Sequence, residues 1–423
     1  MIELAVTLIF IAGYTGIALE ERLFVNKAAT SLMLGVALWV IAAITLSPET
    51  IHEYLTHTSS DIFGLIIFLI TAMTLVEILI HYHFFDYIEY WLRRKSWTQY
   101  QLGWAVAAMA FIFSAFLDNL TTTIVAIQIT RRMFSYKARL YVAVLVVIVA
   151  NAGGAFSPIG DVTTLMMWFA KKFTADQVII QGFLPSLALA LVATIMILCN
   201  VERIPAVEKK ESSTFNPSHT DWVVIIATIG SFLLPLVAAL VGLPPYMGLI
   251  AGLGFVWFLI DVAKRARPQE THLKARIKKF FQHTDLESIQ FFLGILLAVG
   301  ALHAMGVLDI ATNFLLNDFS SDGQIAAAFI GLGIGSAIID NVPLTAAVIS
   351  SMPHISAYLW VLLAIAVGTG GSLLVIGSAA GVIAMGMMRR LSFTQYIKIG
   401  TLPALLGFIA AMIVWAIQYW IFF

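Results

Sequence analysis

Long apolar stretches alternate with short polar segments along the whole chain. A helix needs ~20 residues to cross the hydrocarbon of a bilayer, and apolar runs of about that length recur throughout. The predicted spans are 2–19, 28–46, 62–80, 179–200, 221–241, 245–261, 289–302 and 399–423. Hydrophobic residues make up 60% of the 423 residues and charged residues only 11%, which is far from the balance of a soluble domain. The pattern predicts an all-α polytopic membrane protein.

Four further apolar stretches are interrupted. Glycine-rich patches interrupt 138–170 and 356–388, which predicts two discontinuous helices. An Asp-Asn pair interrupts 101–130 and 325–352, leaving arms of 17 and 11 residues in the first and of 15 and 11 residues in the second. Arms of 11 residues are too short to cross, and each stretch therefore predicts a re-entrant hairpin that enters and leaves on the same side.

The distribution of basic residues predicts the orientation. Cytoplasmic loops carry an excess of Lys and Arg. With the N-terminus outside and one crossing for each span, the predicted inner loops hold 22 of the 24 Lys and Arg, and only Lys171 and Lys172 fall outside. This topology places the C-terminus outside as well and makes the two hairpins enter from opposite faces. The first span lacks a basic start and a small-residue cleavage site, so we expect it to remain uncleaved.

Two pairs of motifs reveal an internal repeat. "SAFLDNLTTTIVAI" (114–127) matches "SAIIDNVPLTAAVI" (336–349) in the second half of the chain. "NAGGAFSPIG" (151–160) matches "GTGGSLLVIG" (368–377), and the two pairs of motifs occur in the same order.

The repeat predicts the domain organisation. The first half is 1–200, a polar cytoplasmic linker occupies 201–220, and the second half is 221–423. Each half has an odd number of crossings, so the second copy is inverted. Two inverted-topology repeats, each with a re-entrant hairpin and a discontinuous helix, are typical of secondary transporters.

Of the 24 acidic residues, 20 lie in loops or at the ends of the apolar segments, and the four farther inside are Glu77, Asp118, Asp161 and Asp340. A charged carboxylate at bilayer depth is costly unless it is paired, protonated or bound to a cation. No Lys or Arg lies inside any predicted span or hairpin, so a clamp for an anion is missing. The candidate neutral ligands carry oxygen and are Asn119, Thr121, Thr122, Asn151, Ser157, Thr163, Thr164, Asn341, Thr345, Thr369, Ser372 and Ser378.

Oxygen ligands around acids favour a hard cation such as sodium. We expect Asp118, Asn119, Asn151 and Asp161 to be the principal sodium ligands, with Thr163 and Thr164 beside them. Asp340 and Asn341 are the matching contribution of the second half, and Glu77 is a possible proton relay. Burial also favours a protonated carboxyl, so sodium and protons would compete for one site, which is a sufficient basis for exchange.

Structural roles for the same residues remain open. Asp118 and Asp340 could cap the helices that follow the hairpin tips, although the Asn after each could cap at lower cost. Asp161 could equally well cap the half-helix that begins at residue 162. The glycines beside the breaks could simply allow close helix packing.

The motifs "FLDNLTTT", "NAGGAFSPIGDVTT", "IIDNVPLTAA" and "GTGGSLLVIGSAAGVIAMG" resemble the signature segments of NhaD-type sodium/proton antiporters. This family belongs to the ion-transporter superfamily, which also contains dicarboxylate, citrate and arsenite carriers. The resemblance covers roughly residues 60–400. It implies a carrier in the bacterial cytoplasmic (inner) membrane that exchanges sodium or lithium for protons by alternating access. It also implies a homodimer and an elevator-like movement of the hairpins against a scaffold. We expect no cofactor.

Three other functions remain alternatives. An arsenite or other small-solute carrier could have the same fold. An intramembrane aspartyl protease could use two buried aspartates, but its characteristic glycine is missing before "PIGD", and no His-Glu-x-x-His motif indicates a metalloprotease. A passive sodium channel would conduct sodium without coupled protons. We therefore expect a carrier, not an enzyme, with the lipid bilayer as its surroundings and no nucleic acid as a partner.

Overall fold

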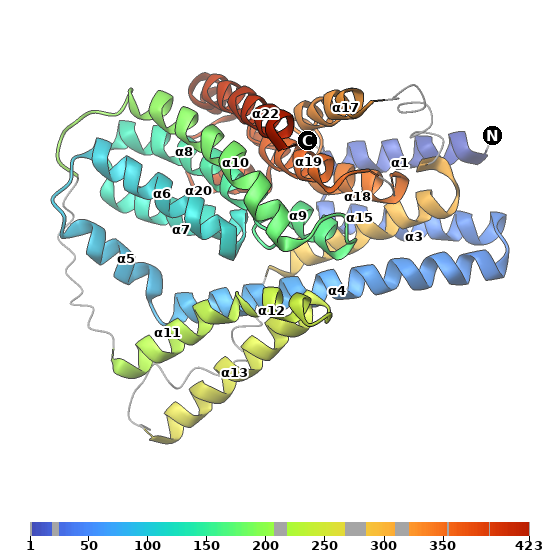
Figure 1. Ribbon diagram of the computed structural model, residues 1–423, viewed down its shortest axis with the longest axis horizontal. Helices are drawn as coiled ribbons and strands as arrows, with labels where there is room; N and C mark the ends of the chain where they lie inside the picture. Colours follow the sequence, from blue (N-terminus) through green and yellow to red (C-terminus); the bar gives the residue numbers. More distant parts are fainter. Residues whose placement is uncertain are drawn as a thin grey trace. The chain divides into compact units, whose positions relative to one another are not determined.

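The computed structural model describes residues 2–18, 25–206, 218–266, 285–308, 321–352, 355–388 and 390–422. In these segments the regular structure is helical, apart from one isolated bridge between Thr98 and Pro205 (Figure 1). Nine of the described helical segments are long and apolar enough to cross a membrane: Lys27–Thr45, Pro48–His81, Gln99–Leu117, Tyr136–Ala155, Ala175–Leu198, His219–Leu240, Pro245–Arg265, Leu286–Ala304 and Phe393–Phe422. The chain is a multi-pass membrane protein.

The surface of these helices is strongly apolar. Ile44, Leu240 and Trp420 have exposed fractions of 79%, 87% and 84%. Large apolar patches are rare on soluble proteins, whereas lipid tails cover such side chains without cost. The exposed side chains therefore fit a lipid environment.

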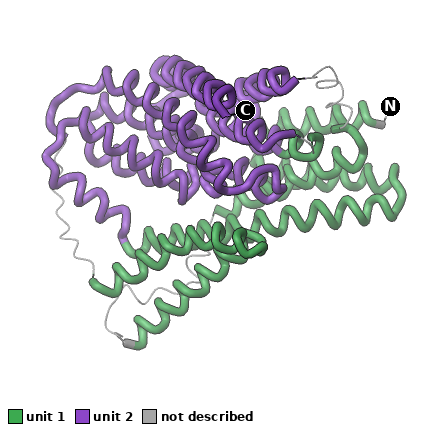
Figure 2. The backbone as a smooth tube through the Cα atoms, in the orientation of Figure 1, with its two compact units in different colours: residues 1–82, 217–320, 346–354 green, residues 83–216, 321–345, 355–423 purple. Residues whose placement is uncertain are grey.

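The chain divides into two compact units (Figure 2). Unit 1 comprises residues 1–82, 217–320 and 346–354, and unit 2 comprises 83–216, 321–345 and 355–423. Each unit thus combines segments from both predicted halves of the sequence. The predicted boundaries at 200 and 221 describe the repeat along the chain, whereas the units describe its packing.

Unit 1 contains helices with few polar residues at their centres. Its helices are α1 (Ile2–Ala18), α3 (Lys27–Thr45), α4 (Pro48–His81), α11 (His219–Ser231), α12 (Leu234–Leu240), α13 (Pro245–Ala266) and α15 (Leu286–Ala304). Helices α3 and α15 approach each other closely at Gly35 and Gly294. A Cβ atom on Gly35 would lie only 2.6 Å from Gly294 O, so the helices could not pack this closely with a side chain there. Trp39 Nε1 donates to Leu297 O at 2.9 Å across the same interface.

Unit 2 contains both discontinuous helices and the candidate site. Its helices are α5 (Phe84–Arg93), α6 (Gln99–Leu117), α7 (Asn119–Met133), α8 (Tyr136–Ala155), α9 (Val162–Phe169), α10 (Ala175–Leu198), α17 (Asp322–Gly335), α19 (Ala357–Gly370), α20 (Ala379–Met387), α21 (Phe393–Tyr396) and α22 (Leu402–Phe422). Helix α18 (Asn341–Ser351) crosses the boundary between the two units. Residues 142–155 of α8 and 358–370 of α19 are buried without interruption, as expected for helices that are apolar all round.

Both discontinuous helices are present. The stretch 138–170 forms α8 and α9, separated by the non-helical residues 156–161. The stretch 356–388 forms α19 and α20, separated by 371–378, which contain a short 3₁₀ turn at Val375–Gly377.

The first Asp-Asn stretch forms a helical hairpin. Helices α6 and α7 pack against each other on either side of Asp118 (Figure 1). Helix α6 has 19 residues and begins at Gln99, because Thr98 and Gln101 form a capping box. At 1.5 Å per residue this arm is about 28 Å long, so the length of α6 does not distinguish a re-entrant arm from a full crossing. The re-entrant form therefore remains a prediction.

Two predicted spans differ in extent from the observed helices. Helix α4 begins at Pro48, well before the expected residue 62, because Ser47 caps it and proline occupies its first turn. Hydropathy misses this polar extension. The span 221–241 is divided into α11 and α12 at Phe232 and Leu233, just before Pro235.

Matching residues of the two sequence repeats make matching contacts within unit 2. Ser114 Oγ donates to Ala150 O at 2.5 Å, and its counterpart Ser336 Oγ donates to Val367 O at 2.9 Å. In each case the segment before an Asp-Asn pair is bonded to the backbone of a discontinuous helix.

The glycines beside the breaks also match. A Cβ on Gly154 would lie 2.6 Å from Gly160 O, and a Cβ on Gly371 would lie 2.5 Å from Gly377 O. Any side chain at Gly154 or Gly371 would force the broken segment away from its own helix. These glycines are therefore required by close backbone packing.

Candidate functional site

The tip of the first hairpin is a single residue, Asp118. Its φ of 77° and ψ of 155° are unusual for a residue with a side chain. Asp118 Oδ1 accepts from Thr121 N at 2.7 Å, and Oδ2 accepts from Thr121 Oγ1 at 2.8 Å. The capping role considered for Asp118 is thus present, and both carboxylate oxygens accept from one neutral residue.

Asn119 joins the hairpin tip to the first discontinuous helix. Its Nδ2 donates to Asp161 Oδ2 at 2.7 Å and to Asn151 Oδ1 at 3.1 Å. Asn119 is the first residue of α7, Asn151 lies in the last turns of α8, and Asp161 immediately precedes α9. Three polar residues from separate elements therefore meet through one amide group.

Asp161 is buried at the start of α9, with an exposed fraction of 3%. Its Oδ1 accepts from Thr163 N at 2.8 Å and from Thr163 Oγ1 at 2.7 Å, while Thr164 Oγ1 donates to Asp161 O at 2.8 Å. Asp161 therefore caps α9, as one sequence interpretation predicted. Capping uses Oδ1, and Oδ2 faces the Asn119 amide.

Asn151 connects the site to the second discontinuous helix. Its side chain is fully buried, and Nδ2 donates to Ser372 Oγ at 2.8 Å and to Ser378 Oγ at 2.9 Å. Ser378 Oγ also donates to Asn151 Oδ1 at 3.3 Å. Ser372 and Ser378 both lie within the break between α19 and α20, so Asn151, near the end of α8, is bonded to the second break.

Several predicted ligands bond elsewhere. Ser157 Oγ donates to Ala115 O at 2.5 Å, and Thr369 Oγ1 donates to Ile365 O of its own helix at 2.6 Å. Asp340 immediately precedes α18, as Asp118 immediately precedes α7. Its Oδ1 accepts from Val342 N in the first turn of α18 at 2.9 Å. Asn341 is the first residue of α18. Glu77 is half-buried within α4 of unit 1.

Three buried threonine hydroxyls form no hydrogen bond in the described structure: those of Thr122, Thr123 and Thr345. Six other buried helical threonines donate to a carbonyl of their own helix four residues earlier, namely Thr71, Thr74, Thr130, Thr194, Thr228 and Thr369. The three exceptions all lie in the helices that follow the two Asp-Asn pairs. Unpaired buried hydroxyls are uncommon, which makes these three available to water or a cation.

Sequence reasoning included Thr122 and Thr345 but missed Thr123. The repeat itself carried the signal, because Thr123 and Thr345 occupy the same place in the two matching Asp-Asn motifs. It also missed Ser114 and Ser336, the first residues of the two quoted motifs, which bond the segments before the Asp-Asn pairs to the broken helices.

The electrostatics of this site are one-sided. In the described part of the chain Asp118 and Asp161 accept hydrogen bonds only from neutral groups. The same described residues contain no group of three or more His, Cys, Asp or Glu side chains that could hold a metal ion. Carboxylate, amide and hydroxyl oxygens are instead ligands for a hard cation.

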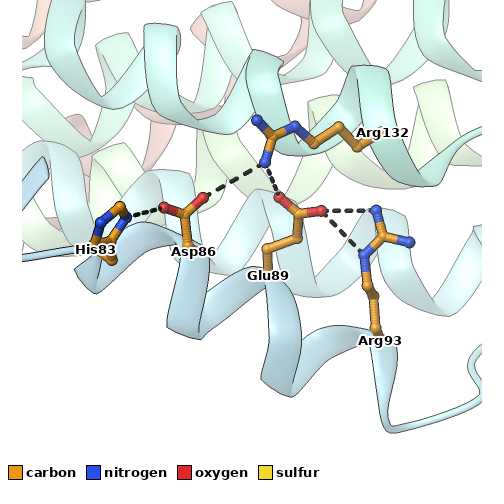
Figure 3. Close-up of polar contacts among 5 residues, drawn as sticks. All are labelled: His83, Asp86, Glu89, Arg93 and Arg132. Atoms are coloured by element: carbon orange, nitrogen blue, oxygen red, sulfur yellow. Dashed lines mark hydrogen bonds and ion pairs between the residues drawn. The ribbon is translucent and has the colours of Figure 1, made fainter. Parts of the chain in front are cut away.

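A second polar cluster in unit 2 has the opposite character (Figure 3). Arg132 Nη1 of α7 lies 2.8 Å from Glu89 Oε2 and 3.5 Å from Asp86 Oδ1 of α5. Glu89 Oε1 also accepts from Arg93 Nη2 at 2.7 Å, and His83 Nδ1 lies 2.8 Å from Asp86 Oδ2. Every acid drawn there has a basic partner, and we call these five residues the α5 charge cluster.

Comparison with known proteins identifies the family. A sequence model described as citrate transporter matches residues 7–368. The chain is 37% identical to sodium/proton antiporter 1 of Arabidopsis thaliana over 94% of this chain and 69% of that protein. It is 35% identical to sodium/proton antiporter 2 of the same plant, over 96% and 97% of the two chains. It is 31% identical to the Na⁺/H⁺ antiporter NhaD of Halomonas elongata, over 97% and 87%.

The matches to the three antiporters cover 94–97% of the chain, and the family model covers residues 7–368. All of the named relatives are transporters, which agrees with a protein that is not an enzyme. The chain belongs to the citrate transporter family and, within it, to the NhaD-type sodium/proton antiporters.

Proposed function

We propose that this protein exchanges sodium or lithium for protons and that the exchange takes place around Asn119, Asn151 and Asp161. One observation carries the proposal. The carboxylates of Asp118 and Asp161, both in unit 2, accept hydrogen bonds only from neutral groups of the described structure. Such acids are stable inside a membrane only when a proton or a cation neutralises them. The names of the relatives support sodium and protons as the exchanged ions.

The chemistry follows from competition for one carboxylate. Asp161 Oδ2 faces the Asn119 amide, 2.7 Å from its nitrogen. A sodium ion that enters there takes Asp161 Oδ2 and the side-chain oxygens of Asn119 and Asn151 as ligands, and the Asp161 proton leaves. When sodium departs, the carboxyl group regains a proton. Either form is neutral enough to move, whereas an empty carboxylate is not.

The other predicted polar residues complete the proposed site. Asp118 is the second acid of the proposed cation and proton site, and Thr121 orients its carboxylate. The hydroxyls of Thr122 and Thr345 supply further oxygens without hydrogen-bond partners in the described structure. Asp340 and Asn341 contribute from the second half. Glu77 of α4 is the proposed proton relay, and the protein itself supplies all the groups, so no cofactor is needed.

Two inverted-topology repeats with re-entrant hairpins form the proposed architecture. The matching bonds of Ser114 and Ser336 support a structural repeat. Unit 2 gathers both discontinuous helices, while the predicted spans within 2–46 and 221–261, which lack central polar motifs, belong to unit 1. We assign alternating access to movement of unit 2, with unit 1 as the scaffold.

The proposed setting is a bacterial cytoplasmic membrane, with both termini outside. The Lys and Arg distribution along the sequence supports this orientation. The proposed assembly is a homodimer, in line with the family resemblance.

The test uses proteoliposomes with an acidic interior and a trapped pH dye. External sodium, lithium or potassium is added to wild-type protein and to Asp118→Asn. Rapid alkalinisation of the interior with sodium or lithium, lost in Asp118→Asn, supports the proposal. Normal exchange by Asp118→Asn contradicts the role of the hairpin acid, and no proton movement by intact wild-type protein contradicts antiport itself.

The match to a citrate transporter model supports one alternative, a small-solute carrier on the same fold. Uptake of radiolabelled citrate or arsenite into the same vesicles tests it. Because the described site lacks a basic side chain bonded to Asp118 or Asp161, we expect no uptake of the citrate anion.

A further inference from the structure

The last long helix changes its winding next to the second break. Residues Phe393–Phe422 form one continuous helical segment, in which Ile397–Thr401 adopt a π turn between α21 and α22. Such turns add one residue to a helical cycle and are frequent at functional sites. The residues at the two ends of this turn, Tyr396 and Thr401, carry hydroxyl groups.

Both hydroxyls donate to backbone carbonyls that the break has released from regular helix. Tyr396 Oη donates to Ser372 O at 2.8 Å, and Thr401 Oγ1 donates to Leu373 O at 2.8 Å. Tyr396 is fully buried, with an exposed fraction of 0%. A buried carbonyl without a partner is costly, so these two bonds stabilise the broken segment in one conformation.

The anchored residue is also part of the candidate site. Ser372 Oγ accepts from Asn151 Nδ2 at 2.8 Å, Asn151 Oδ1 accepts from Asn119 Nδ2 at 3.1 Å, and that same nitrogen donates to Asp161 Oδ2 at 2.7 Å. Tyr396 is therefore connected to the Asp161 carboxylate through Ser372, Asn151 and Asn119. The links are hydrogen bonds, except that Ser372 itself joins its carbonyl to its side chain, and all of these residues lie in unit 2.

The first half cannot make the same anchor. When the two breaks are aligned on their matching glycine motifs, Tyr396 corresponds to Ile179 and Thr401 corresponds to Leu184, both in α10. Neither side chain has a hydroxyl group. The anchor is therefore specific to the second break, and the two halves are unequal at this point.

We propose that Tyr396 and Thr401 are positioning residues that set the sodium affinity of the exchanger by holding Ser372 in place to orient Asn151. This inference rests on the proposed sodium/proton exchange. Neither residue touches the ion. Their hydroxyls orient the Ser372 backbone, Ser372 orients the Asn151 amide, and the Asn151 oxygen is a proposed ion ligand.

The experiment measures the sodium dependence of proton exchange in proteoliposomes for Tyr396→Phe, Thr401→Val and Thr401→Ser. Tyr396→Phe raises the half-saturating sodium concentration by about fivefold, the factor that one net hydrogen bond is worth. The maximal rate changes much less. Thr401→Val shifts the half-saturating concentration in the same direction, and Thr401→Ser restores it because serine retains the hydroxyl.

Tyr358→Phe is the matched control. Tyr358 is also buried, and its hydroxyl donates to the Trp415 carbonyl of α22 at 3.4 Å, outside the chain of bonds to Asp161. Its half-saturating concentration stays at the wild-type value. Equal sodium dependence for Tyr396→Phe and Tyr358→Phe overturns the inference, as does a loss of maximal rate in Tyr396→Phe with unchanged half-saturation.

Thermal unfolding in detergent, with and without sodium, covers variants that exchange too weakly to analyse. Sodium stabilises Tyr396→Phe less than wild type if the inference holds, and equally if it does not. Absence of exchange by the wild type would instead contradict the proposed function, so the two failures are distinguishable.

Discussion

Unit 2 contains two groups of acids that solve the problem of burial in different ways. In the α5 charge cluster, Glu89 is buried to an exposed fraction of 8% and has the guanidinium groups of Arg93 and Arg132 beside it (Figure 3). At the candidate site, Asp161 is buried to 3% and accepts only from Asn119 and Thr163. The first acid is permanently neutralised by fixed charges.

This difference separates a structural acid from an exchangeable one. A carboxylate already paired with arginine gains little from a proton or a sodium ion, because either must displace a guanidinium that is charged at all accessible pH values. A carboxylate among amides and hydroxyls gains its neutralising charge only from a mobile ion. Burial alone therefore does not identify a transport site; the partners of the buried acid do.

The strongest test of this comparison removes one carboxylate charge from the candidate site and, separately, one from the α5 charge cluster. Asp161→Asn should abolish sodium-driven proton movement, a loss of about 100-fold or more, since a hydrogen-bonded charged group contributes ~1.5–3 kcal/mol and the proton carrier itself is lost. Dye-loaded proteoliposomes measure the rate. Asp86→Asn, which changes an acid of the α5 charge cluster, should retain most of the exchange; comparable losses in both variants would remove the distinction.

The second prediction concerns the amide that joins three elements. Asn119→Ala removes the donor to Asp161 and Asn151, and we expect the half-saturating sodium concentration to rise about tenfold, equivalent to ~1.4 kcal/mol. The measurement is exchange rate against sodium concentration. Asn200→Ala provides the matched control, because the exposed Asn200 side chain, just beyond the end of α10, donates to the Met196 carbonyl. An unchanged half-saturating concentration in Asn119→Ala would argue against the amide as a ligand.

Much of this arrangement was predictable from sequence, and the physical reasons are local. Glycines and a proline before Asp161 predicted the break and the possible cap, since both depend on backbone preferences within a few residues. The Asp-Asn pair likewise predicted the turn at Asp118. What local patterns could not give is which polar residues meet: Asn151 reaches Ser372 and Ser378 only because two breaks far apart in sequence lie together.

Two other features could not be predicted from hydropathy or from local sequence motifs. The polar first turns of α4 lack the hydropathy of a span, so its start at Pro48 was missed. Tyr396 lies in an ordinary amphipathic stretch, and only the π turn and the second break together give its hydroxyl a role.

The third prediction addresses the structural side of the comparison. Glu89→Gln leaves Arg93 and Arg132 without their shared carboxylate and should lower the free energy of unfolding by about 1–2 kcal/mol, after allowance for the partial exposure of Arg132. Thermal unfolding in detergent measures this loss. The half-saturating sodium concentration should remain at the wild-type value. Asp261→Asn, which breaks an exposed pair with Lys264, should have almost no effect on stability.

A sodium-affinity defect in Glu89→Gln with unchanged stability would contradict this assignment. It would place the α5 charge cluster in the transport path, and the proposed division between fixed and mobile neutralising charges would fail.

The smallest expected effect comes from a hydroxyl without a partner. Thr123 Oγ1 is buried and unpaired, whereas Thr194 Oγ1 in α10 donates to Ala190 O at 2.6 Å. Replacing an unsatisfied hydroxyl with a methyl group of the same shape is neutral or stabilising, whereas removing a satisfied one costs ~1 kcal/mol. Thr123→Val should therefore keep or raise the unfolding temperature, and Thr194→Val should lower it.

For the sodium dependence of exchange, Thr123→Val should have the larger effect and Thr194→Val the smaller one. If water or sodium uses the Thr123 hydroxyl during exchange, Thr123→Val raises the half-saturating sodium concentration by about threefold, a free-energy change of ~0.6 kcal/mol, while Thr194→Val leaves it unchanged. Stability and transport are measured on the same preparations. A variant that is as stable as wild type yet binds sodium more weakly can have lost only a functional contact, whereas equal sodium dependence in both variants would make Thr123 a packing residue.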